Sequence, residues 1–262
     1  MSVSTTTTPA LARTVRGDGA GLLLVHGAGG GVEANYGPVL DGLAAVRRVV
    51  GADLPGTGLT PPSEGALDAD ELVDRLVEAA DAEGLERFAV SGYSLGSALA
   101  VRLTARHPER VTALVLSAAF AHADTRTDLA AAVWHRLFES GQHELLAQYV
   151  QLMALSEPVL NSLTPAAVQD AARGLAPVIP AGTGDHVDLV RRIDVRADLA
   201  RITVPTLVVV TTGDPLIAPG LQRQLAAAIP HAEVAELATG HLPFAERPQE
   251  WLELMTDFLS RV

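Results

Sequence analysis

Short apolar runs alternate with helical segments along most of this chain, and few folds satisfy that alternation. The runs are GLLLVHG, RRVVGAD, RFAVSGY, VTALVLSAAF, PTLVVVTTGD and AEVAELATG. Between the second and third runs, apolar residues at positions 72, 73, 76, 77 and 80 mark one face of a helix. This pattern predicts a mostly parallel sheet covered by helices on both faces. With 262 residues and 48% apolar content, the chain is long enough to bury one large core.

One region breaks the alternation. Residues 121–192 show helical patterns and no convincing strand, so we predict a helical cap there, inserted after the sixth strand. The core is then expected at residues 11–120 and 193–262. We expect the threonine-rich residues 1–10 to be disordered, and ALARTVRGDG is a candidate edge strand. Insertions on a rigid α/β scaffold commonly build the ligand site.

Charge and cysteine content narrow the function classes. A net charge of −12 disfavours nucleic acid and anionic membranes as partners, because phosphate binding needs basic patches. The absence of cysteine excludes disulfides, thiolate nucleophiles and cysteine-ligated metals. The N-terminal sequence lacks the pattern of a signal peptide, and no apolar run is long enough to span a bilayer. We therefore expect a cytoplasmic monomer or homodimer that acts on a small molecule.

The stretch GYSLG, residues 92–96, lies between a predicted strand and a predicted helix. A serine at a sharp strand-to-helix turn is exposed to substrate, but the turn brings the two elements so close that only glycine fits two residues before and after it. Ser94 is therefore a candidate nucleophile. The helix that starts at Leu95 directs free backbone N–H groups towards the same place, which favours an oxyanion.

Three further features fall at the carboxyl ends of predicted strands. The glycine-rich loop in LLLVHGAGGG offers a second oxyanion donor, the N–H of Ala28. Asp214 follows the run PTLVVVTTG, and His241 follows the last run. The carboxyl ends of parallel strands meet at one sheet edge, where such folds bind their ligands. Ser94, Asp214 and His241 are therefore expected to lie together.

These motifs resemble those of the α/β-hydrolase superfamily, in its serine-nucleophile branch of small esterases and cofactor-free haloperoxidases. The matching residues are His26-Gly27, DLPGTG at 53–58, GYSLG, Asp214 and Gly240-His241. The resemblance implies Ser94 as nucleophile, His241 as general base and then acid, Asp214 as the residue that orients the imidazole, and no cofactor or metal. Two details leave the acid open: Thr211 stands where members often carry glycine, and Asp124 lies where some members place the acid.

Other residues allow a functional and a structural interpretation. Tyr93, Trp134, Tyr149 and Met153 are candidates for substrate binding, although packing alone also accounts for them. His26 is expected to brace loops. The histidines in or near the cap have no metal-ligand spacing, and we expect them at the surface: His122, His135, His143 and His186.

The sequence therefore predicts a serine hydrolase that acts on a small to medium, largely apolar ester, lactone or thioester through an acyl-enzyme. The alternatives are a lyase, cyclase, perhydrolase or haloperoxidase on the same fold, or a ligand-binding receptor. A dinucleotide-binding domain fits poorly, because Val32 stands where the last glycine or alanine of that motif belongs.

Overall fold

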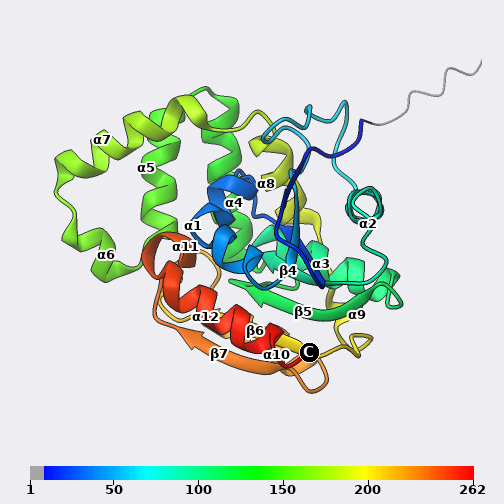
Figure 1. The fold of residues 1–262 in the computed structure, drawn as a ribbon. Helices are drawn as coiled ribbons and strands as arrows, with labels where there is room; N and C mark the ends of the chain where they lie inside the picture. Colours follow the sequence, from blue (N-terminus) through cyan, green and yellow to red (C-terminus); the bar gives the residue numbers. More distant parts are fainter. Residues whose placement is uncertain (1–8) are drawn as a thin grey trace, which may run out of the picture.

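A seven-stranded sheet forms the centre of the protein, in the order β1-β3-β2-β4-β5-β6-β7 (Figure 1). The structure is a computed structural model and describes residues 9–262, so most of the predicted disordered head lies outside the described residues. Only β1 runs antiparallel, and as a four-residue edge strand it matches the candidate in ALARTVRGDG. The strands are β1 Arg13–Arg16, β2 Gly21–Val25, β3 Arg48–Ala52, β4 Phe88–Tyr93, β5 Val111–Ser117, β6 Thr206–Thr211 and β7 Glu233–Leu237.

Successive side chains of a buried strand enter two separate cores, as the two-residue period of a strand requires. Leu23 and Val25 of β2 pack in one core, with residues of the helices at 69–81, 95–106 and 219–228. Leu22 and Leu24 pack in the other, with residues of the helices at 32–44 and 248–259. The predicted parallel sheet covered by helices on both faces is therefore confirmed.

The helices outside the cap follow the βα alternation. The predicted apolar face of the helix at 69–81 is buried throughout, and Asp68 caps this helix by accepting from two backbone N–H groups. These helices are α1 Val32–Ala44, α2 Ala69–Asp81, α3 Leu95–Arg106, α9 Arg196–Leu199, α10 Pro219–Ala228, α11 Pro243–Glu246 and α12 Pro248–Leu259.

Helices α4 to α8 lie between β5 and α9, and we call them the cap (Figure 1). They follow the fifth strand of the described chain, not a sixth, because only β1 precedes β2 in residues 9–262. Thr164 caps one of them by accepting from the backbone N–H of Ala167, and Pro165 is its first residue. The elements are α4 Thr125–Glu139, α5 His143–Ala154, α6 Glu157–Ser162, α7 Pro165–Leu175, the short 3₁₀ helix η1 Ala176–Val178, and α8 Thr183–Arg192.

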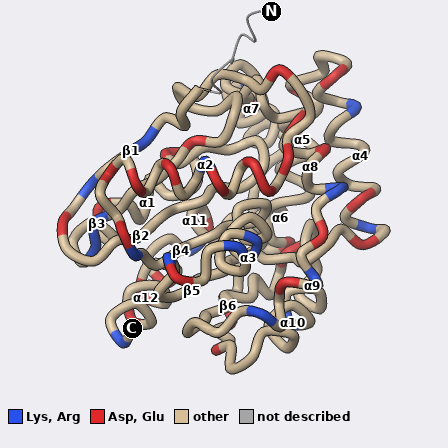
Figure 2. Tube along the Cα trace, turned by 90° about the vertical axis from the view of Figure 1, so that its right-hand side faces the viewer, with Lys and Arg blue, Asp and Glu red and all other residues tan. Residues whose placement is uncertain are grey.

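Except for Arg47, Asp198 and Asp214, which are buried, the Arg, Asp and Glu side chains of residues 9–262 are at least partly exposed. Acidic residues recur along α2 (Figure 2), and arginines of α3 pair with two of them, Asp70 and Asp74. Within residues 9–262, no helix has the length and apolar character needed to cross a membrane.

Candidate active site

Ser94 occupies a strained turn between β4 and α3. Its φ of 53° and ψ of −120° lie in a region that residues other than glycine rarely adopt. A Cβ on Gly92 would lie 2.4 Å from the carbonyl oxygen of Gly96, and one on Gly96 would lie 2.0 Å from the carbonyl oxygen of Val25. Both glycines are therefore required by close backbone approach.

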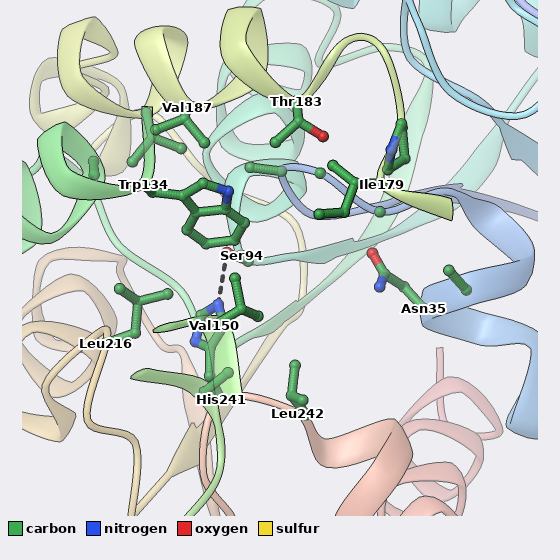
Figure 3. A pocket seen from close by; sticks show the side chains of 18 of the residues that line it. Asn35, Ser94, Trp134, Val150, Ile179, Thr183, Val187, Leu216, His241 and Leu242 are labelled. Carbon is green, nitrogen blue, oxygen red and sulfur yellow. Dashed lines mark hydrogen bonds between the residues drawn. The ribbon is translucent and has the colours of Figure 1, made fainter. Parts of the chain in front are cut away.

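A chain of hydrogen bonds joins Ser94, His241 and Asp214 (Figure 3 shows its first part). His241 Nε2 lies 2.9 Å from Ser94 Oγ, and His241 Nδ1 lies 2.7 Å from Asp214 Oδ2. The three residues follow β4, β7 and β6, whose carboxyl ends share one sheet edge, and all three are buried. The structure thus brings together the three residues that the sequence singled out.

Four other donors hold the carboxylate of Asp214. Its Oδ1 accepts from the backbone N–H groups of Leu216 and Ile217, each at 2.9 Å. Its Oδ2 accepts from Thr211 Oγ1 at 2.9 Å and from Gln222 Nε2 at 3.3 Å. Thr211, the departure from the family pattern, therefore supplies a hydroxyl donor where glycine would supply none. Neither Thr211 nor Gln222 was predicted to contact the acid.

Asp124, the alternative acid, has a different position. It is the N-cap of α4, and its Oδ1 accepts from the backbone N–H of Thr127 at 2.8 Å. Its carboxylate thereby satisfies a helix terminus, whereas Asp214 contacts the imidazole.

The loop that carries His241 is tied to the cap. The backbone N–H of His241 donates to the carbonyl oxygen of Ala154 at 2.7 Å, and the Tyr93 hydroxyl donates to the carbonyl oxygen of His241 at 2.8 Å. The carboxylate of Glu246 accepts from the N–H and hydroxyl of Ser156 and from the N–H of Gly240. The end of α5 and this loop are therefore fixed to each other.

Ala28 and Leu95, whose backbone N–H groups are the predicted oxyanion donors, follow β2 and β4. Within residues 9–262, neither the N–H of Ala28 nor that of Leu95 has a hydrogen-bond partner. The side-chain oxygen of Asn35 accepts from the N–H of Gly27 at 3.0 Å and so holds the loop that contains Ala28. A Cβ on Gly27 would lie 3.1 Å from that of Ser94, so this loop packs directly against the nucleophile.

His26 braces the neighbouring loops, as predicted. Its Nδ1 donates to the carbonyl oxygen of Gly27 at 2.8 Å, and its Nε2 accepts from the N–H of Leu54 at 2.9 Å. One donor and one acceptor are what a neutral imidazole offers. Burial lowers the pKa of His26 to about 4, against a smaller opposing effect of the bond to Gly27.

His186 was expected at the surface, and that prediction is wrong. It is fully buried, where its Nδ1 accepts from the N–H of Gly29 at 3.2 Å and its Nε2 donates to the carbonyl oxygen of Pro55 at 2.9 Å. Burial, and next the neighbouring His26, lower the pKa of His186 to about 3. Because these partners lie 157 and 131 residues away in sequence, no local pattern could reveal them.

A cavity of about 330 Å³ opens beside Ser94 and His241, between the sheet edge and the cap (Figure 3). Tyr93 and Trp134 line it, as predicted. Tyr149 and Met153 do not; the Tyr149 hydroxyl instead donates to the carbonyl oxygen of Ala130. Other residues between β5 and β6 line the cavity, among them Leu146, Ala147, Val150, Ile179, Thr183 and Val187.

The cavity is largely apolar. Among the described residues that line it, none carries a carboxylate or a guanidinium. Within the described part of the chain, no three His, Asp or Glu side chains are grouped so that they could hold a metal ion.

A mostly parallel sheet with a serine elbow after β4 and helices inserted before β6 is the architecture of the α/β hydrolases. Sequence comparison agrees: residues 22–248 match the model of the alpha/beta hydrolase fold family. The chain belongs to this family, as its motifs indicated.

Individual relatives share most of their length with this chain. It is 31% identical to a pyrrolizixenacetamide deacetylase of Xenorhabdus hominickii over 94% of this chain and 92% of the relative. It is 30% identical to a pimeloyl-[acyl-carrier protein] methyl ester esterase of Aromatoleum aromaticum, over 90% and 96%. Among solved structures, an α/β-hydrolase enzyme from a Medee basin deep-sea metagenome library has a TM-score of 0.88 at 17% identity, over 96% and 94%. Family and relatives support the prediction of an enzyme of the ester-hydrolase type.

Proposed function

We propose that this protein is a serine hydrolase that cleaves a small to medium, largely apolar ester, lactone or thioester through an acyl-enzyme. The observation that carries the proposal is the hydrogen-bond chain from Ser94 Oγ through His241 to Asp214 at the wall of an apolar cavity. The names of the two relatives, a deacetylase and a methyl ester esterase, support acyl transfer to water.

In the first half-reaction, Ser94 Oγ attacks the substrate carbonyl carbon while His241 Nε2 takes the hydroxyl proton. The carbonyl oxygen becomes an oxyanion, which accepts from the N–H groups of Ala28 and Leu95. Asp214 holds Nδ1 protonated and stabilises the imidazolium. Collapse of the intermediate breaks the bond to the leaving group, which takes its proton from His241, and the acyl group remains on Ser94.

In the second half-reaction, water replaces the leaving group. His241 takes a proton from this water, whose oxygen attacks the acyl carbon, and the same two N–H groups bind the oxyanion. Collapse releases the carboxylic acid and returns the proton to Ser94 Oγ.

The size and the apolar lining of the cavity support a small to medium, uncharged substrate. An apolar space of about 330 Å³ holds a compact acyl or alcohol group, and a charged substituent would lose its hydration without an opposite charge among the lining residues. We therefore expect turnover of p-nitrophenyl acetate and butyrate, with activity falling at long acyl chains.

The decisive experiment combines a fluorophosphonate probe with Ser94→Ala. The probe should label the wild type at Ser94, and the alanine variant should fold normally but lose several powers of ten in kcat. Labelling at another residue, or full activity in Ser94→Ala, would contradict the proposal. A parallel assay for peracid formation from acetate and peroxide tests the perhydrolase alternative.

Labelling at Ser94 without turnover of any ester in a chain-length series would indicate a lyase, a cyclase or a receptor on the same scaffold. Turnover that peaks at long acyl chains would contradict the compact cavity.

A further inference from the structure

Two cap residues that line the cavity each carry a buried polar atom without a partner among residues 9–262. Trp134 Nε1 and Thr183 Oγ1 are buried, and neither has a hydrogen-bond partner among residues 9–262. Thr183 is 1% exposed, and both side chains line the cavity across from Ser94 and His241 (Figure 3). A buried polar atom without a partner is costly, so natural proteins rarely leave one unless a ligand or water satisfies it.

The two side chains lie against the same residue, Gly29, in the loop after β2. A Cβ on Gly29 would lie 3.3 Å from Trp134 Cζ2 and 3.4 Å from Thr183 Oγ1, so both side chains pack against the same point of the loop. That point is next to Ala28, the proposed oxyanion donor. A third orphaned hydroxyl in the cavity, that of Thr127, lies seven residues before Trp134 on α4, about 10 Å along the helix axis. It is therefore not part of this pair.

The chemistry of the pair fixes the kind of group it binds. An indole N–H only donates, so the partner of Trp134 must be an acceptor. The Thr183 hydroxyl donates equally well, and a carbonyl oxygen has two lone pairs for two donors. No arginine is among the described lining residues, so a carboxylate or phosphate would lack a counter-charge.

We infer that Trp134 and Thr183 form a specificity site for a second, neutral carbonyl oxygen, carried by the substrate a few bonds from the scissile carbonyl. The substrates are then oxo-acyl esters or lactones with an otherwise apolar body. This inference rests on the proposed acyl transfer at Ser94, because it places the second carbonyl relative to that reaction.

The test compares p-nitrophenyl esters that differ only in this acceptor: 4-oxopentanoate against 4-methylpentanoate, and 5-oxohexanoate against 5-methylhexanoate. Each kcat/KM is divided by the rate of hydroxide hydrolysis, so that intrinsic reactivity cancels. The wild type should prefer one oxo ester over its methyl partner. Trp134→Phe and Thr183→Val should each reduce that preference about fivefold, the order of one neutral hydrogen bond, and Thr183→Ser should retain it.

Thr104→Val is the matched control, since Thr104 is a buried helical threonine that does not line the cavity and whose hydroxyl donates to the Ala100 carbonyl. It should keep the wild-type preference. Fluorophosphonate titration of Ser94 gives the active concentration of each variant. Equal turnover of oxo and methyl esters by a labelled wild type, or a preference unchanged in both variants, would overturn this inference alone. No labelling and no ester turnover would overturn the proposed function as well.

Discussion

Acidification should destabilise this protein through two histidines that no reaction step uses. In the folded state His26 and His186 are neutral, with pKa values lowered to about 4 and about 3, chiefly by burial. In the unfolded chain both should titrate near 6.5. Between these pH values the unfolded state binds more protons than the folded state. The contribution of the two neutral histidines to the unfolding free energy is therefore fully present above about pH 6.5, and it is lost as the pH falls towards the folded-state pKa values.

The magnitude follows from the same values. Each unit of pKa difference corresponds to about 1.4 kcal/mol. Between pH 7 and pH 5 the lowered pKa values therefore cost about 2 kcal/mol of unfolding free energy for each histidine, and about 4 kcal/mol together. This is a large fraction of the stability of a typical domain.

Urea unfolding of the wild type and of His186→Gln at pH 7 and pH 5 measures this effect. Glutamine keeps one acceptor for the Gly29 N–H and one donor for the Pro55 carbonyl, but it does not titrate. The loss between the two pH values should be about 2 kcal/mol smaller in the variant. His231→Asn removes an exposed histidine and should keep the wild-type loss. If His186→Gln loses as much stability on acidification as the wild type, His186 is not a source of the acid sensitivity.

Four further substitutions test the site. Asp214→Asn should lower kcat about ten thousandfold by leaving the imidazole in the wrong tautomer, whereas Asp124→Asn should change kcat less than twofold. Steady-state kinetics with p-nitrophenyl butyrate compares the two variants. A larger loss in Asp124→Asn than in Asp214→Asn would show that Asp124 is the acid. Gly96→Ala should prevent folding, because its Cβ would lie 2.0 Å from the Val25 carbonyl oxygen; a soluble variant with a native circular-dichroism melt would refute the steric account. Glu246→Gln should reduce the unfolding free energy by about 2 kcal/mol, measured in urea, and an unchanged midpoint would show that its three hydrogen bonds are not needed.

Features carried by short segments were predictable from the sequence. The apolar runs are long and regular enough to define the strands β2 to β7, and the elbow around Ser94 is determined by five consecutive residues. Asp214 and His241 follow strands directly, so the parallel topology alone places them at one edge.

Features that depend on contacts between distant segments were not predictable. On α5, Val150 and Tyr149 are neighbours on a helix with apolar residues on adjoining faces, and only the packing of α4 against it decides which one reaches the cavity. Thr183 and His186 are ordinary polar residues in a polar stretch; their burial arises from the approach of α8 to loops that follow β2 and β3.

The cap is not an exchangeable module in this protein. Its polar side chains bind segments next to the site: Ser156 binds Glu246, which also accepts from Gly240 beside His241, and His186 binds Gly29 and Pro55 in the loops after β2 and β3. A chimera that grafts the helices of another family member onto this sheet would therefore change substrate preference and the support of the reacting groups at once. Directed evolution of new specificity has to keep Ser156 and His186 fixed while it varies the apolar positions between them.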